Sequence, residues 1–409
     1  MKSLEYRDFQ EKLAFEKELN ILRNDFYYKL IDSDGITLVD FMYFPLDIVS
    51  GDIYTARRIS KNKILYLLVD GMGKGLSASL TSMIITAFIN HYIDKMVAGD
   101  EYKLEMLIHE AIEFIRPILL EEEALAIDFI CFDAHTYTLD YAKFAMPFAL
   151  LQTQTGEVIK LKSNNPPLSK WTRSFEIDTY DVSNIKKFLF VSDGITEGKM
   201  KDGRLYAQEI EKDFQSSFTR EEFKEKLFAK LGDIEDDLTL IFLNRLELYE
   251  KNMLVECSFG TSLEDVEKAN QWYMEMLAKY VTNESFVEKG GLVFNELFMN
   301  AYEHGNLGIE NHLKHQMLEQ DTYIEKLLEL EKNCTKKINI KLYEIKNNDS
   351  YYIVTEITDE GDGFDTQLLS TIFRNAQMFN GRGVFVSRKN SLGIYYNTKG
   401  NRVLFLNKV

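Results

Sequence analysis

Four aspartates lie where an apolar stretch meets glycine or a second acidic residue. Asp70 ends the run Tyr66-Leu-Leu-Val-Asp-Gly-Met-Gly-Lys-Gly75. The other three are found in Ser50-Gly-Asp52, Phe190-Val-Ser-Asp-Gly194 and Asp236-Asp-Leu-Thr239. One Asp-Gly pair most often marks a turn, but four acidic segments in order, each beside a strand-like stretch, favour a shared site. Clustered carboxylates repel one another unless a cation lies between them. Two hard divalent cations with oxygen ligands can activate a water for attack on a phosphate ester.

A second polar set lies in Asn295-Glu-Leu-Phe-Met-Asn-Ala-Tyr-Glu-His-Gly305 and beyond. On a helix, Glu296 and Asn300 share one face. The Asn300 carbonyl could hold Mg²⁺ and thereby phosphates, and Glu296 could act as a base. Asp359 follows a predicted strand and could accept a hydrogen bond from an adenine amino group. Three later glycines would let the backbone approach a nucleotide: Gly361, Gly363 and Gly383.

The elements that must position these residues divide into three parts. Residues 1–30 are predicted to form one helix, because Phe15, Leu19, Leu22 and Phe26 recur at helical spacing. Two roles stay open for it: a helix that docks on the next domain, or a short regulatory coiled-coil helix that dimerises the chain.

Residues 31–247 are predicted to form an α+β domain, a sandwich of two antiparallel sheets with helices outside. Its strands are expected at 36–44, 63–69, 127–133, 147–152, 156–161, 186–191 and 237–243, and its helices at 76–97, 102–120 and 219–231. Residues 252–409 are predicted to form a smaller α/β layer. Its helices are expected at 262–280, 286–304 and 312–333, and its strands at 336–345, 350–358, 392–397 and 402–407.

Composition narrows the class of function. The chain has 409 residues and a net charge of −17, which disfavours sequence-independent binding to nucleic acid or anionic membranes. No signal peptide or membrane-spanning run is expected, and three scattered cysteines predict free thiols in a cytoplasmic protein.

The four acidic segments resemble those of SpoIIE-type PPM serine/threonine phosphatases over roughly residues 30–245. The resemblance implies two Mn²⁺ or Mg²⁺ ions, with Asp70 shared by both metals and the Gly71 carbonyl as a second contact. It also implies Asp193 and Asp236 as ligands of one metal, and Asp52 on or near the site. Asp237 is not expected to be a ligand. The chain departs from the family at Lys143-Phe-Ala-Met146, where Asn-Ala-Gly-His is common.

The second set resembles the N box and glycine boxes of the GHKL superfamily, which has the Bergerat α/β sandwich fold. The likeness is to anti-sigma-factor-type serine kinases such as RsbW and SpoIIAB, over about residues 255–409. It implies Mg²⁺–ATP binding through Asn300 and Asp359, with Glu296 as the catalytic base. The charged segment 312–333 resembles an insertion in phosphatase-fused members of this group.

Together the resemblances imply a regulator of a bacterial partner-switching system. The phosphatase half would act on a phosphorylated STAS-type antagonist protein, and the kinase half would oppose it or bind a sigma factor. The alternative is a phosphatase whose second domain only senses nucleotide and docks partners. A third reading, an adaptor with two inactive sites, is disfavoured by the complete set of aspartates.

Overall fold

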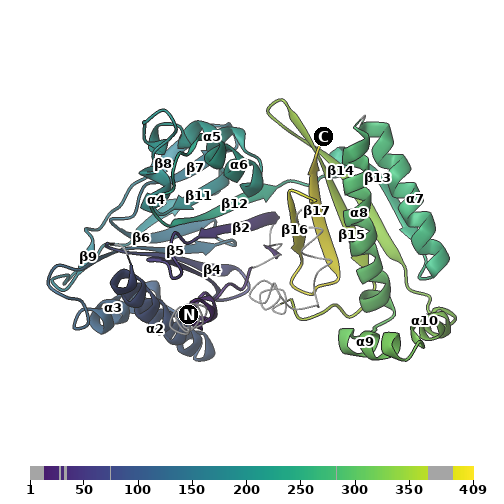
Figure 1. Cartoon of the computed structure of the whole chain (residues 1–409), viewed down its shortest axis with the longest axis horizontal. Helices are drawn as coiled ribbons and strands as arrows, with labels where there is room; N and C mark the ends of the chain where they lie inside the picture. The colour runs from purple at the N-terminus through teal and green to yellow at the C-terminus, as the bar shows by residue number, and fades with distance from the viewer. Residues whose placement is uncertain (1–12, 27–28, 32–34, 74, 282, 367–389) are drawn as a thin grey trace, which may run out of the picture. The chain divides into compact units, whose positions relative to one another are not determined.

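The structure is a computed structural model, and it describes residues 13–26, 29–31, 35–73, 75–281, 283–366 and 390–409. Contacts between residues divide the chain into two compact units (Figure 1). The described residues up to 26 and from 35 to 245 form the first unit, and residues 29–31 and those from 246 onward form the second. The short strand β1 (Leu30–Ile31) is grouped with the second unit, where the adjacent Lys29 forms a bridge with Tyr396.

Two sheets make up the first unit. One has the order β10-β6-β5-β4-β3, and these neighbours pair in antiparallel fashion. Its strands are β3 (Asp52–Arg58), β4 (Lys63–Gly71), β5 (Ala124–Asp133), β6 (Thr138–Phe144) and β10 (Asp178–Asp181), and β9 (Leu168–Ser169) pairs with β5. The other follows the order β2-β12-β11-β7-β8. Its strands are β2 (Ile36–Phe44), β12 (Leu238–Leu246), β11 (Ile185–Val191), β7 (Ala149–Thr153) and β8 (Val158–Leu161).

Helices cover the outer faces of both sheets (Figure 1). Helices α2 (Leu76–Ala98) and α3 (Leu104–Ile115) bury their apolar residues against alternate positions of β4 and β5, such as Val69 and Ile127. Against the other sheet lie α4 (Asp193–Thr196), η1 (Tyr206–Gln208), α5 (Ile210–Ser216) and α6 (Arg220–Lys230). Between the sheets, the rings of Phe132 and Phe188 meet edge to face. The predicted α+β class with antiparallel sheets is therefore confirmed in this unit.

Helix α2 is the one described helix whose length and composition would suffice to cross a membrane. Half of the apolar window in α2 is buried within the protein, in the core shared with α3 and the first sheet. From the sequence we expected no apolar run long enough to span a membrane, and α2 corrects that expectation by length and composition.

The N-terminal segment corrects one sequence prediction. Residues 13–21 are helical, but the helix does not continue to residue 30. Instead Asn24 accepts a hydrogen bond from the Phe26 backbone N–H (2.8 Å) and forms a bridge to Ala56 at the edge of β3. Phe26 is fully buried, with its ring next to that of Tyr66. The C-terminal part of the apolar stripe thus packs on its own unit, whereas residues 1–12 lie outside the described chain.

The second unit has two layers. A five-stranded antiparallel sheet has the order β13-β14-β15-β17-β16. Its strands are β13 (Met253–Phe259), β14 (Ile338–Asn347), β15 (Ser350–Asp359), β16 (Gly393–Tyr396) and β17 (Arg402–Lys408). Helices α7 (Leu263–Tyr280) and α8 (Glu284–Asn300) cover one face (Figure 1). Tyr273 joins the layers, because its ring stacks on Phe294 at 4.1 Å and its hydroxyl lies 3.0 Å from that of Thr355.

The charged segment 312–333, predicted as one helix, forms two. They are α9 (Asn311–Glu319) and α10 (Tyr323–Glu331), and between them Asp321 has a positive φ of 55° that ends the first helix. The predicted helix 286–304 also changes form, because a π-helical turn, η3 (Ala301–Asn306), follows α8. Glu303 in this turn is buried. It accepts a hydrogen bond from the Tyr323 hydroxyl and forms an ion pair with Lys314. The two-helix segment is thus anchored to the turn that follows Asn300.

Candidate functional site

Strand register brings the first two aspartates together. Asp52 begins β3 and lies directly opposite Asp70 near the end of β4. Directly opposite residues of an antiparallel pair share a face, so both side chains are on the side of the sheet that faces away from α2. Leu67 and Val69, on the alternate positions, pack in the core against α2 and α3. A glycine is needed after Asp70, because a Cβ atom on Gly71 would lie 2.8 Å from both the Ala78 carbonyl oxygen and the Ser82 hydroxyl.

The other two aspartates come from the second sheet. Asp193 is the first residue of α4, directly after β11, and Asp236 lies just before β12. Gly194 allows these turns to approach, since a Cβ atom there would lie 2.1 Å from the Asp237 carbonyl oxygen and 3.1 Å from the Asp236 Cβ. A residue with a side chain at position 194 would force the two turns apart.

Electrostatics shows that the four carboxylates act on one another. The pKa of Asp70 is raised to about 10, first by burial and then by the charges of Asp52, Asp193 and Asp236 and a hydrogen bond with Asp193. Burial also raises the pKa of Asp52 well above its ordinary value, although a hydrogen bond with Ser192 opposes this shift. Without a cation, Asp52 and Asp70 therefore retain protons at neutral pH.

The donor set fits a hard divalent cation. Asp52 is buried, and its Oδ2 has no hydrogen-bond partner in the described part of the chain, which is costly for a carboxylate unless something positive binds it. Among the residues described, no three acidic, histidine or cysteine side chains already stand at ion-binding spacing.

Asp237 has a different part. Its two carboxylate oxygens accept hydrogen bonds from the backbone N–H groups of Leu46 (2.6 Å) and Gly51 (2.7 Å). Asp237 thus uses both oxygens to hold the loop that leads into Asp52.

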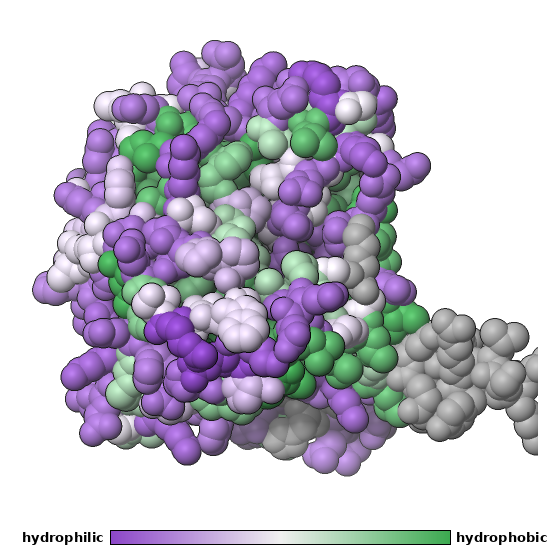
Figure 2. All heavy atoms as spheres, turned by 90° about the vertical axis from the view of Figure 1, so that its left-hand side faces the viewer, coloured by the Kyte–Doolittle hydropathy of each residue, from purple (hydrophilic) through white to green (hydrophobic). Residues whose placement is uncertain are grey.

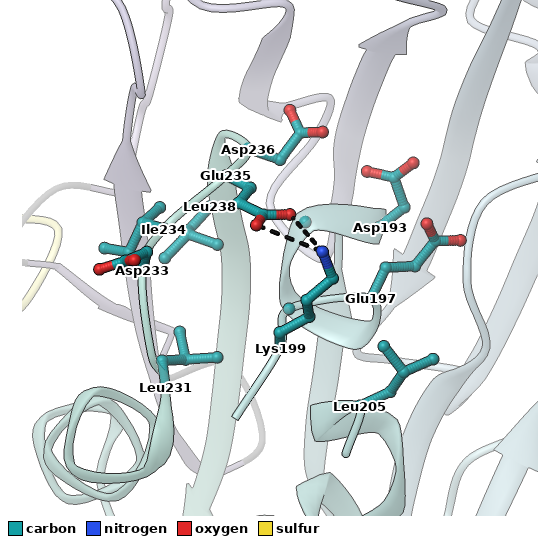
Figure 3. Close-up of a pocket in the computed structure, with 12 residues that line it drawn as sticks. Asp193, Glu197, Lys199, Leu205, Leu231, Asp233, Ile234, Glu235, Asp236 and Leu238 are labelled. Atoms are coloured by element: carbon teal, nitrogen blue, oxygen red, sulfur yellow. Dashed lines mark hydrogen bonds and ion pairs between the residues drawn. The ribbon is translucent and has the colours of Figure 1, made fainter. Parts of the chain in front are cut away.

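A cavity of about 270 Å³ opens beside Asp193 and Asp236 (Figure 3). Both carboxylates lie at one end of it, and Lys199 reaches across to Glu235 at 2.9 Å. Its apolar lining is Leu205, Leu231, Ile234 and Leu238. Elsewhere on the unit, apolar residues reach the surface in several separate places among hydrophilic ones (Figure 2). The exposed large apolar residues of this unit include Phe44, Leu46, Met72, Leu76 and Leu80.

Two charged residues of the sandwich interior were not expected from the sequence. Lys143 and Asp128 lie opposite each other on β6 and β5, fully buried, and form an ion pair. Asp128 is two residues beyond Ala126, the partner of Asp70 on β5. In the sequence, Asp128 and Lys143 each interrupt an apolar run, which is an unusual position for a charged residue. Only the strand register shows that they pair with each other.

Two acids of the second polar set, Glu296 and Asp359, act on Tyr396. Glu296 and Asn300 are half-buried on the last turns of α8, and Asp359 is buried at the end of β15. Burial raises the pKa of the Tyr396 hydroxyl, and the charges of Glu296 and Asp359 raise it further, so both acids lie near this ring. Sequence reasoning missed Tyr396, because an apolar strand with two tyrosines carries no local signal of a site.

Glycines let the backbone close around Asp359. A Cβ atom on Gly305 would lie 2.5 Å from the Asp359 carboxyl carbon, and one on Gly361 would lie 2.1 Å from the Gly305 carbonyl oxygen. Asp359 accepts a hydrogen bond from the Gly361 N–H at 2.9 Å. Burial raises the pKa of Asp359 to about 6, against the opposing effects of that bond and of Lys399. Gly363 has a positive φ of 80°, whereas Gly383 lies outside the described residues.

Comparisons with known proteins cover the first unit best. Residues 60–246 match the family model described as Stage II sporulation protein E (SpoIIE). This range includes Asp70, Asp193 and Asp236 but not Asp52. A search of curated protein sequences gave no match.

Several solved structures are similar at low identity. The RsbU and RsbW domains of Rv1364c from Mycobacterium tuberculosis are 15% identical with a TM-score of 0.47, covering 91% of this chain and 94% of that one. The SiaA-PP2C domain of Pseudomonas aeruginosa is 18% identical with a TM-score of 0.48, covering 60% and 99%. The PP2C phosphatase domain of SpoIIE from Bacillus subtilis, with a fragment of its regulatory domain, is 19% identical with a TM-score of 0.43, covering 51% and 63%.

Proposed function

We propose that the first unit is a metal-dependent protein serine/threonine phosphatase. The observation that carries this proposal is the pairing of buried Asp52 with half-buried Asp70, which interacts with Asp193 and Asp236. One carboxylate oxygen of Asp52 has no hydrogen-bond partner among the described residues. The match of residues 60–246 to the SpoIIE family supports the same assignment.

Each residue then has a defined part. Asp70 would be shared by two Mn²⁺ or Mg²⁺ ions, Asp52 and the Gly71 carbonyl would complete one side, and Asp193 and Asp236 would hold one ion from the other sheet. When bound, the two ions supply positive charge to a phosphate ester and lower the pKa of a water beside it. Ser192 orients Asp52 through its hydroxyl. The cavity beside Asp193 and Asp236 would accept a side chain next to the phosphorylated residue.

The test is hydrolysis of a phosphoserine protein by the full chain with Mn²⁺ or Mg²⁺. Asp70→Asn should lower the rate of hydrolysis. The loss should exceed the roughly 10–100-fold that follows substitution of residues that only orient metal ligands. Asp181→Asn is the matched control, because this exposed residue caps a turn far along the sheet. Full activity of Asp70→Asn at saturating metal would refute the assignment.

We further propose that the second unit binds Mg²⁺–ATP and acts as a serine/threonine kinase of opposing activity. The grouping of Glu296 and Asp359 around Tyr396 and the close backbone at Gly305 and Gly361 favour a nucleotide site. Asn300 would hold the ion, Asp359 would accept from adenine, and Glu296 would take the proton of the acceptor hydroxyl. Phosphoryl transfer needs mainly positioning and charge neutralisation, which this small set can supply.

Calorimetry separates binding from transfer. Asn300→Ala should abolish binding of Mg²⁺–ATP, whereas Glu296→Ala should keep binding and stop transfer to a partner. Asn295→Ala, exposed on the same helix, should behave like the unchanged protein. If the unchanged chain binds ATP but never transfers phosphate, the alternative function holds: a non-catalytic nucleotide-sensing and docking module.

The proposed partner is a phosphorylated STAS-type antagonist protein of a cytoplasmic partner-switching system, with a sigma factor as a second candidate. The chain is incubated with each STAS protein of the host. One of these proteins should gain the mass of a phosphate in the presence of ATP, and its phosphorylated form should lose that mass in the presence of Mn²⁺. No mass change on any STAS protein would exclude this partner class and favour an adaptor.

A further inference from the structure

Glu18, on the N-terminal helix at residues 13–21, reaches the loop that leads into the acidic cluster. Its side chain is fully buried. Oε1 accepts hydrogen bonds from the backbone N–H of Ser50 (3.1 Å) and from the hydroxyl of Tyr43. Oε2 is also buried and has no hydrogen-bond partner among the described residues. A helix residue far away in sequence thus contacts the backbone two residues before Asp52.

That loop is held from several sides at once. Asp237 binds the N–H groups of Leu46 and Gly51, as described above. The Gly51 carbonyl accepts a hydrogen bond from the Gly71 N–H at 3.2 Å, which joins the loop before β3 to the end of β4. Ser50 completes the arrangement, because its hydroxyl accepts from the Asp52 N–H at 3.1 Å. Glu18 is the one anchor of this loop that belongs to the N-terminal helix.

Burial of a carboxylate at this position is costly, and an apolar residue would avoid that cost. What Glu18 provides is an acceptor of the right length for a backbone N–H that would otherwise be buried without a partner. Loss of that acceptor would release Ser50, and Asp52 would lose its fixed place opposite Asp70, because only one residue separates it from Ser50.

We propose that Glu18 is a positioning residue for the cation site, so that the N-terminal helix sets the affinity of the acidic cluster for Mn²⁺ or Mg²⁺. The proposal rests on the cation-dependent function proposed above. Glu18 acts through the Ser50–Asp52 backbone and does not itself bind the ion. What matters is therefore the length of the side chain and its acceptor oxygen, and its charge is secondary.

Four variants of the full chain separate these possibilities, with Mn²⁺ binding measured by calorimetry. Glu18→Gln keeps the length and the acceptor, and should bind Mn²⁺ within about threefold of the unchanged protein. Glu18→Asp keeps the charge but is one methylene too short, and Glu18→Ala lacks the acceptor. Both should weaken binding by about 10–100-fold, as the loss of residues that orient ligands does. Glu16→Ala, exposed on the same helix, should have no effect.

Each other outcome overturns the proposal. If Asp retains the affinity and Gln loses it, charge decides and the residue does not act by positioning. Equal Mn²⁺ affinity in all variants, with only the unfolding temperature of the metal-free protein lowered, would leave a purely structural role. In both cases the unchanged chain still binds the cation, and the proposed phosphatase stands. If the unchanged chain binds neither Mn²⁺ nor Mg²⁺, the proposed function fails and this inference fails with it. The Gln and Asp pair decides even if Glu18→Ala does not fold.

Discussion

Glu18 carries a consequence for stability at the scale of a single residue. Burial raises its pKa to about 7, although bonds from Tyr43 and Ser50 oppose this shift and the charge of Asp237 adds to it. The folded state therefore binds this proton more tightly than the unfolded state, whose ordinary value is near 4.5, so the associated stability is present at low pH and is lost as pH rises through 7. Glu18→Gln should thus be more stable than the unchanged protein at pH 8, by about 1–3 kcal/mol.

The advantage of Glu18→Gln should shrink as pH falls towards 5, measured by urea unfolding of the metal-free chain. Glu16→Gln provides the control, because Glu16 is exposed on the same helix. If the difference in unfolding free energy between Glu18→Gln and the unchanged protein did not change with pH, burial of an ionised carboxylate at this position would be contradicted.

Gly194 supplies a second prediction at this scale. Gly194→Ala would place a methyl group 2.1 Å from the Asp237 carbonyl oxygen, so the turns carrying Asp193 and Asp236 must separate. We expect a loss of about 1–3 kcal/mol in unfolding free energy and weaker Mn²⁺ binding by calorimetry. Gly232→Ala is the control, because its Cβ would lie 3.4 Å from the nearest atom. Undiminished Mn²⁺ affinity in Gly194→Ala would show that these turns do not meet at the cation.

At the scale of elements, the anchoring of α9 and α10 to the turn after Asn300 depends on one buried carboxylate. Glu303→Ala would leave Lys314 and the Tyr323 hydroxyl without their shared partner. Removing such a partner costs about 1–3 kcal/mol, which chemical denaturation would measure. Glu329→Ala removes an exposed pair with Lys326 on α10, and its loss of unfolding free energy should be much smaller than that of Glu303→Ala. Equal losses in both variants would mean that Glu303 is not an anchor.

At the scale of the whole molecule, the division into two units predicts that a cation acts on one unit alone. A ligand stabilises the cooperative unit to which it binds. Mn²⁺ should therefore slow amide hydrogen exchange at the ends of β3, β4 and β12, and leave the sheet of β13–β17 unchanged. The observable is exchange of peptides from both units, with metal-free and Mn²⁺-loaded samples compared side by side. Equal protection of β14 and β15 would contradict independent units.

The sequence by itself determined the elements whose signal is local. Strand β2 and helix α2 begin at the predicted residues, since apolar periodicity and flanking glycines are properties of a short window. It also singled out the acidic segments, because a carboxylate beside an apolar run is unusual wherever it occurs. Local patterns were weakest where a segment depends on its neighbours: β3 and β13 were not predicted, and the segment 312–333 was predicted as one helix.

Only the tertiary structure decided which residues meet. Asp52 faces Asp70 because of the register of β3 on β4, which no spacing along the chain reveals. Lys143 meets Asp128 for the same reason, and Tyr396 joins Glu296 and Asp359 because β16, α8 and β15 converge. The N-terminal helix stops short of its predicted end because Asn24 and Phe26 gain more by joining β3 and the core than by continuing the helix. Contacts between distant segments depend on folding of the whole unit, and helical propensity is too weak to oppose them.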